Sequence, residues 1–233
     1  MIRVENLRKR IGNKDVLKDV NFILERGSFT VVVGPNGAGK TTLLKILALL
    51  TRPSSGRVLI NGVAVGPETA ALRRQIGVVG HNSFLYAGLT AVENLSFYGQ
   101  MYGLERIPGR VVEAVRQVGL LHALHEPVRT FSRGMLQRLA IARAILHDPA
   151  LLLLDEPYTG LDREAEETLN RLLQSWKEEG RTIFLITHKY ADGLSLADRF
   201  MVLVKGRVAY AEAVEGLGAE DFRGLCLAGG EGA

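Results

Sequence analysis

Short, unbroken hydrophobic runs recur along the chain, separated by longer segments in which polar and hydrophobic positions are mixed. The runs rich in Val, Leu and Ile lie at residues 30–33, 151–154, 182–186 and 200–204. Such runs are typical of parallel strands that are covered on both faces. Over residues 165–176, hydrophobic positions recur every three or four residues, which predicts a helix that Gly180 can end. The alternation predicts an α/β fold with a mixed, mainly parallel sheet flanked by helices.

Two parts of the chain depart from this alternation. Residues 2–4, 20–24 and 57–63 favour antiparallel strands, and the last of them contains the turn pair Asn61-Gly62. Residues 84–146 instead predict a helical insertion. There, Thr90 and Glu93 form a capping box, a second helix is expected over 111–118, and Ser132 is placed to cap a third that runs to about residue 146. We therefore expect one domain over 1–233, with 1–83 and 147–233 forming the core and the β part, and 84–146 forming a helical subdomain.

Composition and charge restrict the classes of partner. The 233 residues are 47% hydrophobic and 23% charged, so the chain can bury a substantial core. The net charge is +4, but the basic residues are dispersed and aromatic residues make up only 6%. A nucleic-acid partner is therefore not expected. With neither an 18-residue hydrophobic run nor a signal-peptide pattern, the chain is expected to be cytosolic or attached to a membrane through another protein.

A glycine-rich segment, GPNGAGKTT, lies between the first hydrophobic run and a helical pattern. Its residues are Gly34, Pro35, Asn36, Gly37, Ala38, Gly39, Lys40, Thr41 and Thr42. Glycines let the backbone wrap closely around an anion, and the loop N–H groups and the helix N-terminus then point at phosphates. Lys40 adds a positive charge near the β and γ groups, and Thr41 offers a hydroxyl to Mg2+. The segment predicts a nucleoside triphosphate site.

Two adjacent carboxylates follow the second hydrophobic run, in the segment LLLLDEP. Asp155 is placed to hold Mg2+, directly or through water, and Glu156 to orient and deprotonate an attacking water. His188 follows the run at 182–186 and should emerge at the same sheet edge, where it could bond the γ-phosphate or the attacking water. In the segment FSRGMLQR, Ser132 and Gly134 lie at a predicted helix N-terminus, which can serve as an anion site or as an ordinary cap.

Taken together and in this order, the segments resemble the ATP-binding subunit of ABC transporters over about residues 1–210. The resemblance implies a P-loop NTPase core with an antiparallel β subdomain and an inserted helical subdomain, which binds ATP and Mg2+ and hydrolyses ATP. It identifies GPNGAGKTT as the Walker A motif, FSRGMLQR as the signature, LLLLDEP as Walker B, Asp162 as part of the D-loop and His188 as the switch histidine. It also implies a head-to-tail dimer in which Ser132 and Gly134 of one subunit contact the ATP held by Lys40 of the other.

Arg133 and Met135 in the signature differ from the family pattern, and so do two positions that bear on metal and base binding. His81 stands where the family usually has a glutamine near the metal; because Mg2+ prefers oxygen ligands, His81 should act through water, or Asn82 should supply an amide oxygen. Ile11 stands where an aromatic side chain usually stacks on adenine, so base recognition should depend on apolar contact.

The resemblance further implies integral membrane permease partners, pairing as a homodimer or heterodimer, and a peripheral location on the cytoplasmic face of the cell membrane. The segment around Gly80, His81 and residues 84–98 is similar to the haem-exporter ATPases of cytochrome c biogenesis, whereas the signature segment also resembles drug and polysaccharide exporters. A soluble ABC ATPase of DNA repair or translation and a module that binds ATP without hydrolysing it are alternatives. Intact Lys40, Asp155, Glu156 and His188 favour hydrolysis.

Overall fold

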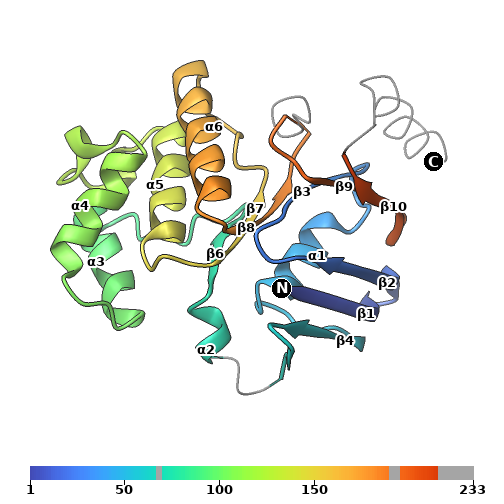
Figure 1. The fold of residues 1–233 in the computed structure, drawn as a ribbon. Helices are drawn as coiled ribbons and strands as arrows, with labels where there is room; N and C mark the ends of the chain where they lie inside the picture. Colours follow the sequence, from blue (N-terminus) through green and yellow to red (C-terminus); the bar gives the residue numbers. More distant parts are fainter. Residues whose placement is uncertain (67–69, 189–194, 215–233) are drawn as a thin grey trace.

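A six-stranded sheet forms the centre of the computed structural model, which describes residues 1–66, 70–188 and 195–214 (Figure 1). Its strand order is β10-β9-β3-β8-β7-β6, and all neighbouring pairs are parallel except β9 with β10. The strands are β3 (Phe29–Val33), β6 (Ile76–Val79), β7 (Leu151–Asp155), β8 (Thr182–Ile186), β9 (Arg199–Val204) and β10 (Arg207–Ala213). The four hydrophobic runs are thus confirmed as β3, β7, β8 and β9.

The central sheet also contains two strands that the hydrophobic runs did not reveal. β10 is an antiparallel edge strand with mixed burial. In β6, Gly77 interrupts the hydrophobic run, and the packing explains why: a Cβ at this position would lie 2.4 Å from the carbonyl oxygen of Ala144. The sheet therefore depends there on a close backbone approach from a neighbouring helix.

A second sheet is antiparallel, with the order β2-β1-β4-β5. Its strands are β1 (Ile2–Ile11), β2 (Lys14–Leu24), β4 (Ser55–Ile60) and β5 (Val63–Ala64). The antiparallel expectation is confirmed, and within 57–63 the turn pair Asn61-Gly62 separates β4 from β5. Asn61 and Gly62 have φ of 52° and 79° and form the two-residue turn of a hairpin, because primed turns need positive φ at both central positions.

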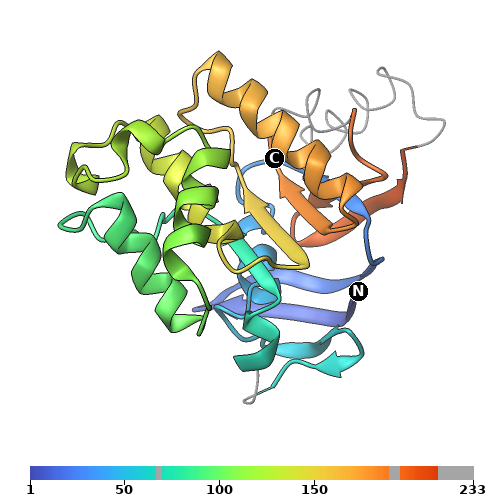
Figure 2. The ribbon, with the colours of Figure 1, turned by 60° about the vertical axis from the view of Figure 1, so that its left-hand side comes forward.

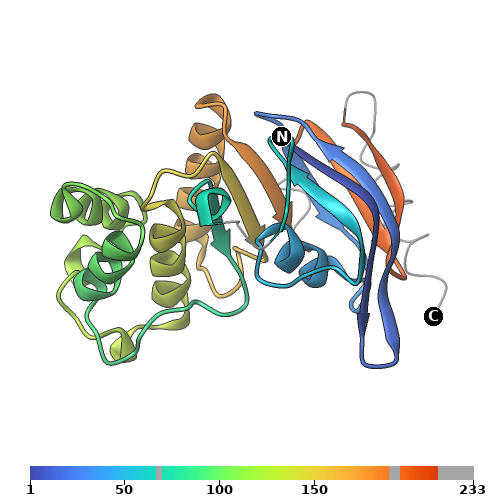
Figure 3. The same ribbon diagram turned by 90° about the horizontal axis from the view of Figure 1, so that it is seen from below.

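More helices cover one side of the central sheet than the other. They are α1 (Lys40–Leu47), α2 (Ala70–Arg73), α3 (Ala91–Met101), α4 (Ile107–Gln117), α5 (Arg133–Ile145) and α6 (Arg163–Glu178), with 3-10 turns at Leu121–Ala123 and Val128–Thr130. α1 lies between the two sheets, whereas α3, α4 and α5 gather at the opposite side of the central sheet (Figures 1 and 3). α6 lies across the strands near α5 (Figure 2).

Local sequence signals account for where several helices begin and end. At the start of α3, the Glu93 N–H donates to the Thr90 side chain and the Thr90 N–H donates to the Glu93 side chain, as the capping box predicts. Ser132 accepts a hydrogen bond from the Met135 N–H at the start of α5. Gly180, with φ of 77°, follows the end of α6. These expectations are confirmed.

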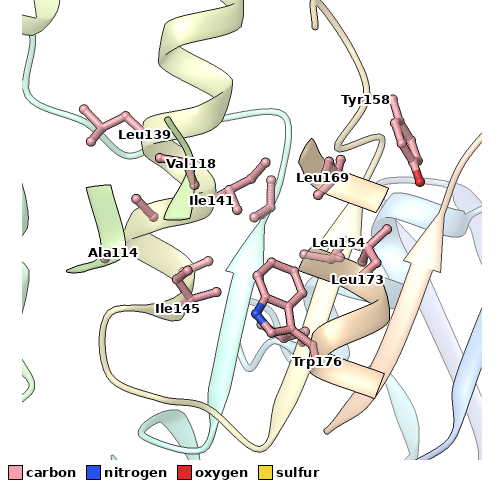
Figure 4. Packing of buried hydrophobic residues seen from close by; sticks show 14 of the residues in the cluster. Ala114, Val118, Leu139, Ile141, Ile145, Leu154, Tyr158, Leu169, Leu173 and Trp176 are labelled. Carbon is pink, nitrogen blue, oxygen red and sulfur yellow. The ribbon is translucent and has the colours of Figure 1, made fainter. Parts of the chain in front are cut away.

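Two hydrophobic clusters cover the two faces of the central sheet. Along β7, Leu151 and Leu153 belong to the cluster shared with α1 and the antiparallel sheet, while Leu152 and Leu154 belong to the cluster shared with α3–α6. Because successive strand residues point to opposite faces, a run of four leucines buries two on each side. Trp176 of α6 is 2% exposed and packs beside Leu154 and Leu173 in the second cluster (Figure 4).

Trp176→Ala is expected to lower the free energy of unfolding by about 3–5 kcal/mol, because it removes a buried aromatic side chain and leaves a cavity. Urea unfolding measures the loss. Leu121→Ala is the control, since Leu121 is 41% exposed and its truncation should cost about 0.5 kcal/mol or less. Equal losses in the two variants would contradict the place of Trp176 in the core.

Candidate functional site

The glycine-rich loop joins β3 to α1 and is shaped by close backbone packing. Gly34 has φ of 150°, and a Cβ there would lie 2.1 Å from the carbonyl oxygen of Leu203 in β9. Gly39 has φ of 105°, and its Cβ would lie 2.8 Å from Leu17 Cδ2. Any larger side chain at these two positions would push the loop away from its neighbours. Among the described residues, no side chain caps α1, so its first N–H groups can face an anion.

Lys40 is the first residue of α1 and is 7% exposed. Its Nζ donates hydrogen bonds to the carbonyl oxygens of Gly34 at 2.6 Å and Pro35 at 3.1 Å. Burial lowers the pKa of the Lys40 ammonium, whereas the nearby carboxylates of Glu156 and Asp155 raise it. The loop therefore wraps around a cation that two acids help to keep charged.

The two acidic residues lie at the end of β7 and differ in backbone conformation. Asp155 ends the strand and is 7% exposed. Glu156 has φ of 52°, a left-handed conformation that is uncommon outside glycine and tends to persist at functional sites. Its N–H donates to Ile186 O of the adjacent strand at 2.9 Å. This contact ties the Glu156 backbone to the strand that leads to His188.

Glu156 and His188 lie together at the sheet edge. The His188 N–H donates to Glu156 Oε2 at 3.3 Å, and His188 Nε2 lies 3.3 Å from Oε1. Oε1 is buried and accepts no hydrogen bond from the residues described. Burial raises the pKa of the Glu156 carboxyl, and the neighbouring Asp155 carboxylate also raises this pKa. Three groups lower the pKa of Glu156: the His188 side chain, the His188 backbone N–H and Lys40. A carboxylate with a raised pKa is a better proton acceptor while it remains ionised.

One cleft of about 340 Å³ brings these groups together. Its lining residues come from β2, from the glycine-rich loop with the start of α1, from the acid pair and from the segment after β8: Lys14, Val16, Asn36, Gly37, Ala38, Gly39, Lys40, Thr41, Thr42, Asp155, Glu156 and His188. The expectation that Lys40 and Asp155 share a pocket is therefore met. Lys14 and Val16 were missed, because only the tertiary packing of β2 beside the loop reveals them.

A second cleft, of about 500 Å³, adjoins the first and shares Thr41, Asp155 and Glu156 with it. It contains His81, along with residues of the N-terminal part of α5 such as Arg133 and Gln137. Gln137 Nε2 donates to Pro157 O at 3.0 Å, which links α5 to the loop after Glu156. His81 therefore shares a cleft with the acid pair, and both His81 and its neighbour Asn82 are exposed.

Ile11 lies at the end of β1, is 56% exposed and pairs in register with Lys14. It is therefore close along the hairpin to a residue that lines the first cleft. No contact with a base follows from this placement.

The signature and D-loop residues meet each other. Ser132 is exposed at the start of α5, and a Cβ on Gly134 would lie 2.9 Å from Gly160 O, two residues before Asp162. Asp162 Oδ1 accepts the Ala165 N–H at 2.9 Å and caps α6. Within one chain, Gly134 thus packs against Gly160, and Ser132, Gly134 and Asp162 are not among the residues that line the cleft of Lys40.

The donor set fits Mg2+ held together with a nucleotide. Among the described residues, no group of three His, Cys, Asp or Glu side chains is arranged to bind a metal. The first cleft does offer the Thr41 hydroxyl and the Asp155 carboxylate, and Mg2+ usually takes one or two protein oxygens and completes its shell with phosphate oxygens and water.

Comparison with known proteins agrees with this geometry. A profile of the ABC transporter family matches residues 17–159. The ABC transporter ATP-binding protein NatA of Bacillus subtilis is 35% identical over 224 residues, which cover 93% of this chain and 91% of NatA. The linearmycin resistance ATP-binding protein LnrL of the same organism is 35% identical over 210 residues, covering 89% of this chain and 68% of LnrL.

Solved structures agree as well. A dimeric ATP-binding cassette in a post-hydrolysis state, bound to ADP and Pi, is 29% identical with a TM-score of 0.85, covering 93% of this chain and all of the other. None of the helices in the described ranges has the length and hydrophobicity needed to cross a membrane. With the family profile, the curated relatives and the solved structures all in agreement, this chain belongs to the ABC transporter family as an ATP-binding subunit that uses ATP with Mg2+ and hydrolyses it.

Proposed function

We propose that this chain powers a membrane exporter, with ATP hydrolysis performed by Glu156, His188 and Lys40. The observation that carries the catalytic part is the single cleft in which these three side chains meet Thr41 and Asp155. A phosphoryl-transfer site needs a phosphate cradle, a cation on the transferred group and an acceptor for the proton of water. In that cleft the glycine-rich loop is the cradle, Lys40 is the cation and Glu156 is the proton acceptor.

The proposed roles follow from chemistry and position. The loop N–H groups and Lys40 bind the phosphates, and Lys40 exchanges its bonds to Gly34 O and Pro35 O for phosphate oxygens. Thr41 and Asp155 hold Mg2+, which neutralises charge on the phosphates. Glu156 accepts the proton of the attacking water, and His188 holds the Glu156 carboxylate in place and can reach the γ-phosphate. His81 acts on the same site through water.

Two subunits close head to tail in this proposal. Ser132 and Gly134, which do not line the cleft of Lys40 in their own chain, then contact the nucleotide held by the partner subunit. The dimeric relative bound to ADP and Pi supports such pairing. Release of the products reopens the pair, and this cycle drives the membrane partner.

The helical insertion and the core have separate parts in this proposal. Residues 84–146 act as a helical subdomain on a core formed by 1–83 and 147–233. Cytosolic loops of a permease dock near residues 81–86, between the core and this subdomain, and hold the chain peripherally on the cytoplasmic face of the cell membrane. The relatives with membrane-transport names support a permease partner.

Haem for cytochrome c maturation is the first candidate cargo, because Gly80, His81 and residues 84–98 resemble haem-exporter ATPases. An antibiotic is the second candidate, supported by similarity to the linearmycin resistance protein and to a lantibiotic transport protein of Streptococcus pyogenes. Both candidates assign the same role to the ATPase site.

Glu156→Gln should preserve ATP binding and reduce hydrolysis by about 100-fold or more, because the amide cannot accept the proton of water. Steady-state phosphate release and nucleotide binding measure the two effects. Glu164→Gln on the exposed first turn of α6 is the control and should hydrolyse ATP normally. Unchanged turnover in Glu156→Gln would remove Glu156 from the proposed role.

Ser132→Arg should leave the subunit folded and able to bind ATP but prevent ATP-dependent pairing, because a bulky cation would occupy the face that meets the partner's nucleotide. Sedimentation in the Glu156→Gln background measures the pairing. Ser175→Arg is the control, because Ser175 lies on the exposed face of α6. Normal pairing of the Ser132 variant would contradict the shared-site dimer.

The cargo is tested with the chain and its co-purified membrane partner in proteoliposomes. We expect haem to raise ATP hydrolysis several-fold and linearmycin to leave it unchanged. Stimulation by linearmycin alone would favour the antibiotic candidate, and stimulation by neither compound would contradict haem and linearmycin as cargo.

A further inference from the structure

One end of the first cleft is formed by β2 rather than by the glycine-rich loop or the acid pair. Lys14 and Val16 are the residues of β2 that line this cleft. Successive residues of a strand lie on opposite faces, so Asp15 lies on the other face of β2 and is not among the lining residues. This end of the cleft therefore presents one cationic side chain, that of Lys14, and one apolar side chain, that of Val16.

Backbone contacts hold β2 against the glycine-rich loop. A Cβ on Gly39 would lie 3.0 Å from the carbonyl oxygen of Val16, so the strand and the loop approach each other closely. The Gly206 N–H, in the turn between β9 and β10, donates to Ala38 O at 3.0 Å, and Gly206 O accepts the Lys18 N–H at 2.7 Å. One turn is thus bonded to both the loop and the strand. These contacts fix where β2 lies relative to the phosphate cradle.

The triphosphate accounts for the other lining residues of the first cleft. The proposed mechanism assigns the glycine-rich loop and Lys40 to the phosphates, and Glu156 and His188 to the attacking water and the γ-phosphate. Beyond its α-phosphate, a nucleotide continues into the ribose and the base. The end of the cleft formed by β2 is therefore the part that is left for the nucleoside.

The Lys14 ammonium is free to bind a ligand. The side chain is exposed, and none of the salt bridges between described residues includes it. Its register partner across the hairpin is the apolar Ile11, whereas Asp15 has Arg10 as its register partner. An ammonium group donates hydrogen bonds and accepts none. The two β2 side chains at the nucleoside end of the cleft therefore supply a donor but no acceptor.

We infer that Lys14 reads the base of the nucleotide and that this chain hydrolyses GTP as well as ATP, with a preference for GTP. Guanine presents two acceptors, N7 and O6, on one edge, whereas adenine presents the acceptor N7 beside the N6 amino donor. The Lys14 ammonium can donate to both guanine acceptors, but it meets a second donor on adenine. Val16 adds only apolar contact, which discriminates weakly between molecules of similar shape. Lys14 therefore decides the choice of base.

The chemistry of the second substrate is that of the first. Water attacks the γ-phosphorus of GTP, the bond from that phosphorus to the β–γ bridging oxygen breaks, and GDP and phosphate leave. Glu156 accepts the proton of the water, as with ATP. This inference therefore rests on the proposed roles of the cleft residues, and it adds a substrate that only the base distinguishes from ATP.

Phosphate release from GTP and from ATP by the full chain tests this inference. We expect kcat/KM for GTP to exceed kcat/KM for ATP by about threefold or more, because Lys14 favours the guanine edge. Lys14→Gln should lower this ratio by about tenfold or more, because an amide both donates and accepts and so pairs with adenine N6 and N7. Lys18→Gln is the matched control, since Lys18 lies on β2 without lining the cleft; it should keep the original ratio.

The affinities for GDP and ADP give a second measurement that does not depend on turnover. GDP should bind more tightly than ADP to the original chain and to Lys18→Gln, and less tightly than ADP to Lys14→Gln. A preference for ATP and ADP in the original chain would overturn the inference and leave the proposed ATP hydrolysis intact. Equal losses for both bases in Lys14→Gln would also overturn it, because Lys14 would then bind phosphate or ribose. Hydrolysis of neither nucleotide would contradict the proposed function and GTP hydrolysis together, while the GDP and ADP affinities would still decide the role of Lys14.

Discussion

The register of three parallel strands fixes the whole site. Val32 of β3 pairs with Ile186 of β8, and Ile186 pairs with Asp155 of β7. The chain leaves each strand at the same edge, so the glycine loop, His188 and Glu156 emerge side by side. A slip of one residue in either pairing would turn buried side chains to the wrong face and separate Lys40 from the acids. The burial that holds the sheet together is thus also what assembles the catalytic groups.

Contacts within the protein itself hold the charged groups of the cleft in place. Lys40 is buried against the carbonyls of its own loop and near two carboxylates, while the raised pKa of Glu156 follows mainly from burial. Fixed charges and dipoles need little reorganisation when a triphosphate enters, and this lowers the cost of reaching the transition state. The left-handed Glu156 backbone belongs to the same arrangement.

β6 connects the second cleft with a buried cation. At its end, His81 reaches the cleft that contains Asp155 and Glu156; within it, Val78 accepts the bond from Arg143 of α5, which is only 6% exposed. Gly77, between them in the packing, allows α5 to approach closely. Close packing transmits small displacements because it leaves little free volume to absorb them. β6 therefore links the surroundings of Arg143 directly to the cleft that contains the acid pair.

The sequence by itself determined the element types, the Walker segments and several helix ends, because strand and helix periodicity, capping boxes and glycine stops act over a few neighbouring residues. It also indicated that Lys40 and Asp155 belong to one site, since both follow buried parallel strands. It did not reveal β6, Lys14, Val16 or the place of Arg143 against β6. Those features depend on contacts between segments far apart in the chain, such as Gly77 with Ala144 and Arg143 with Val78. Only the tertiary structure decides them, because burial and pairing across such separations leave no local pattern.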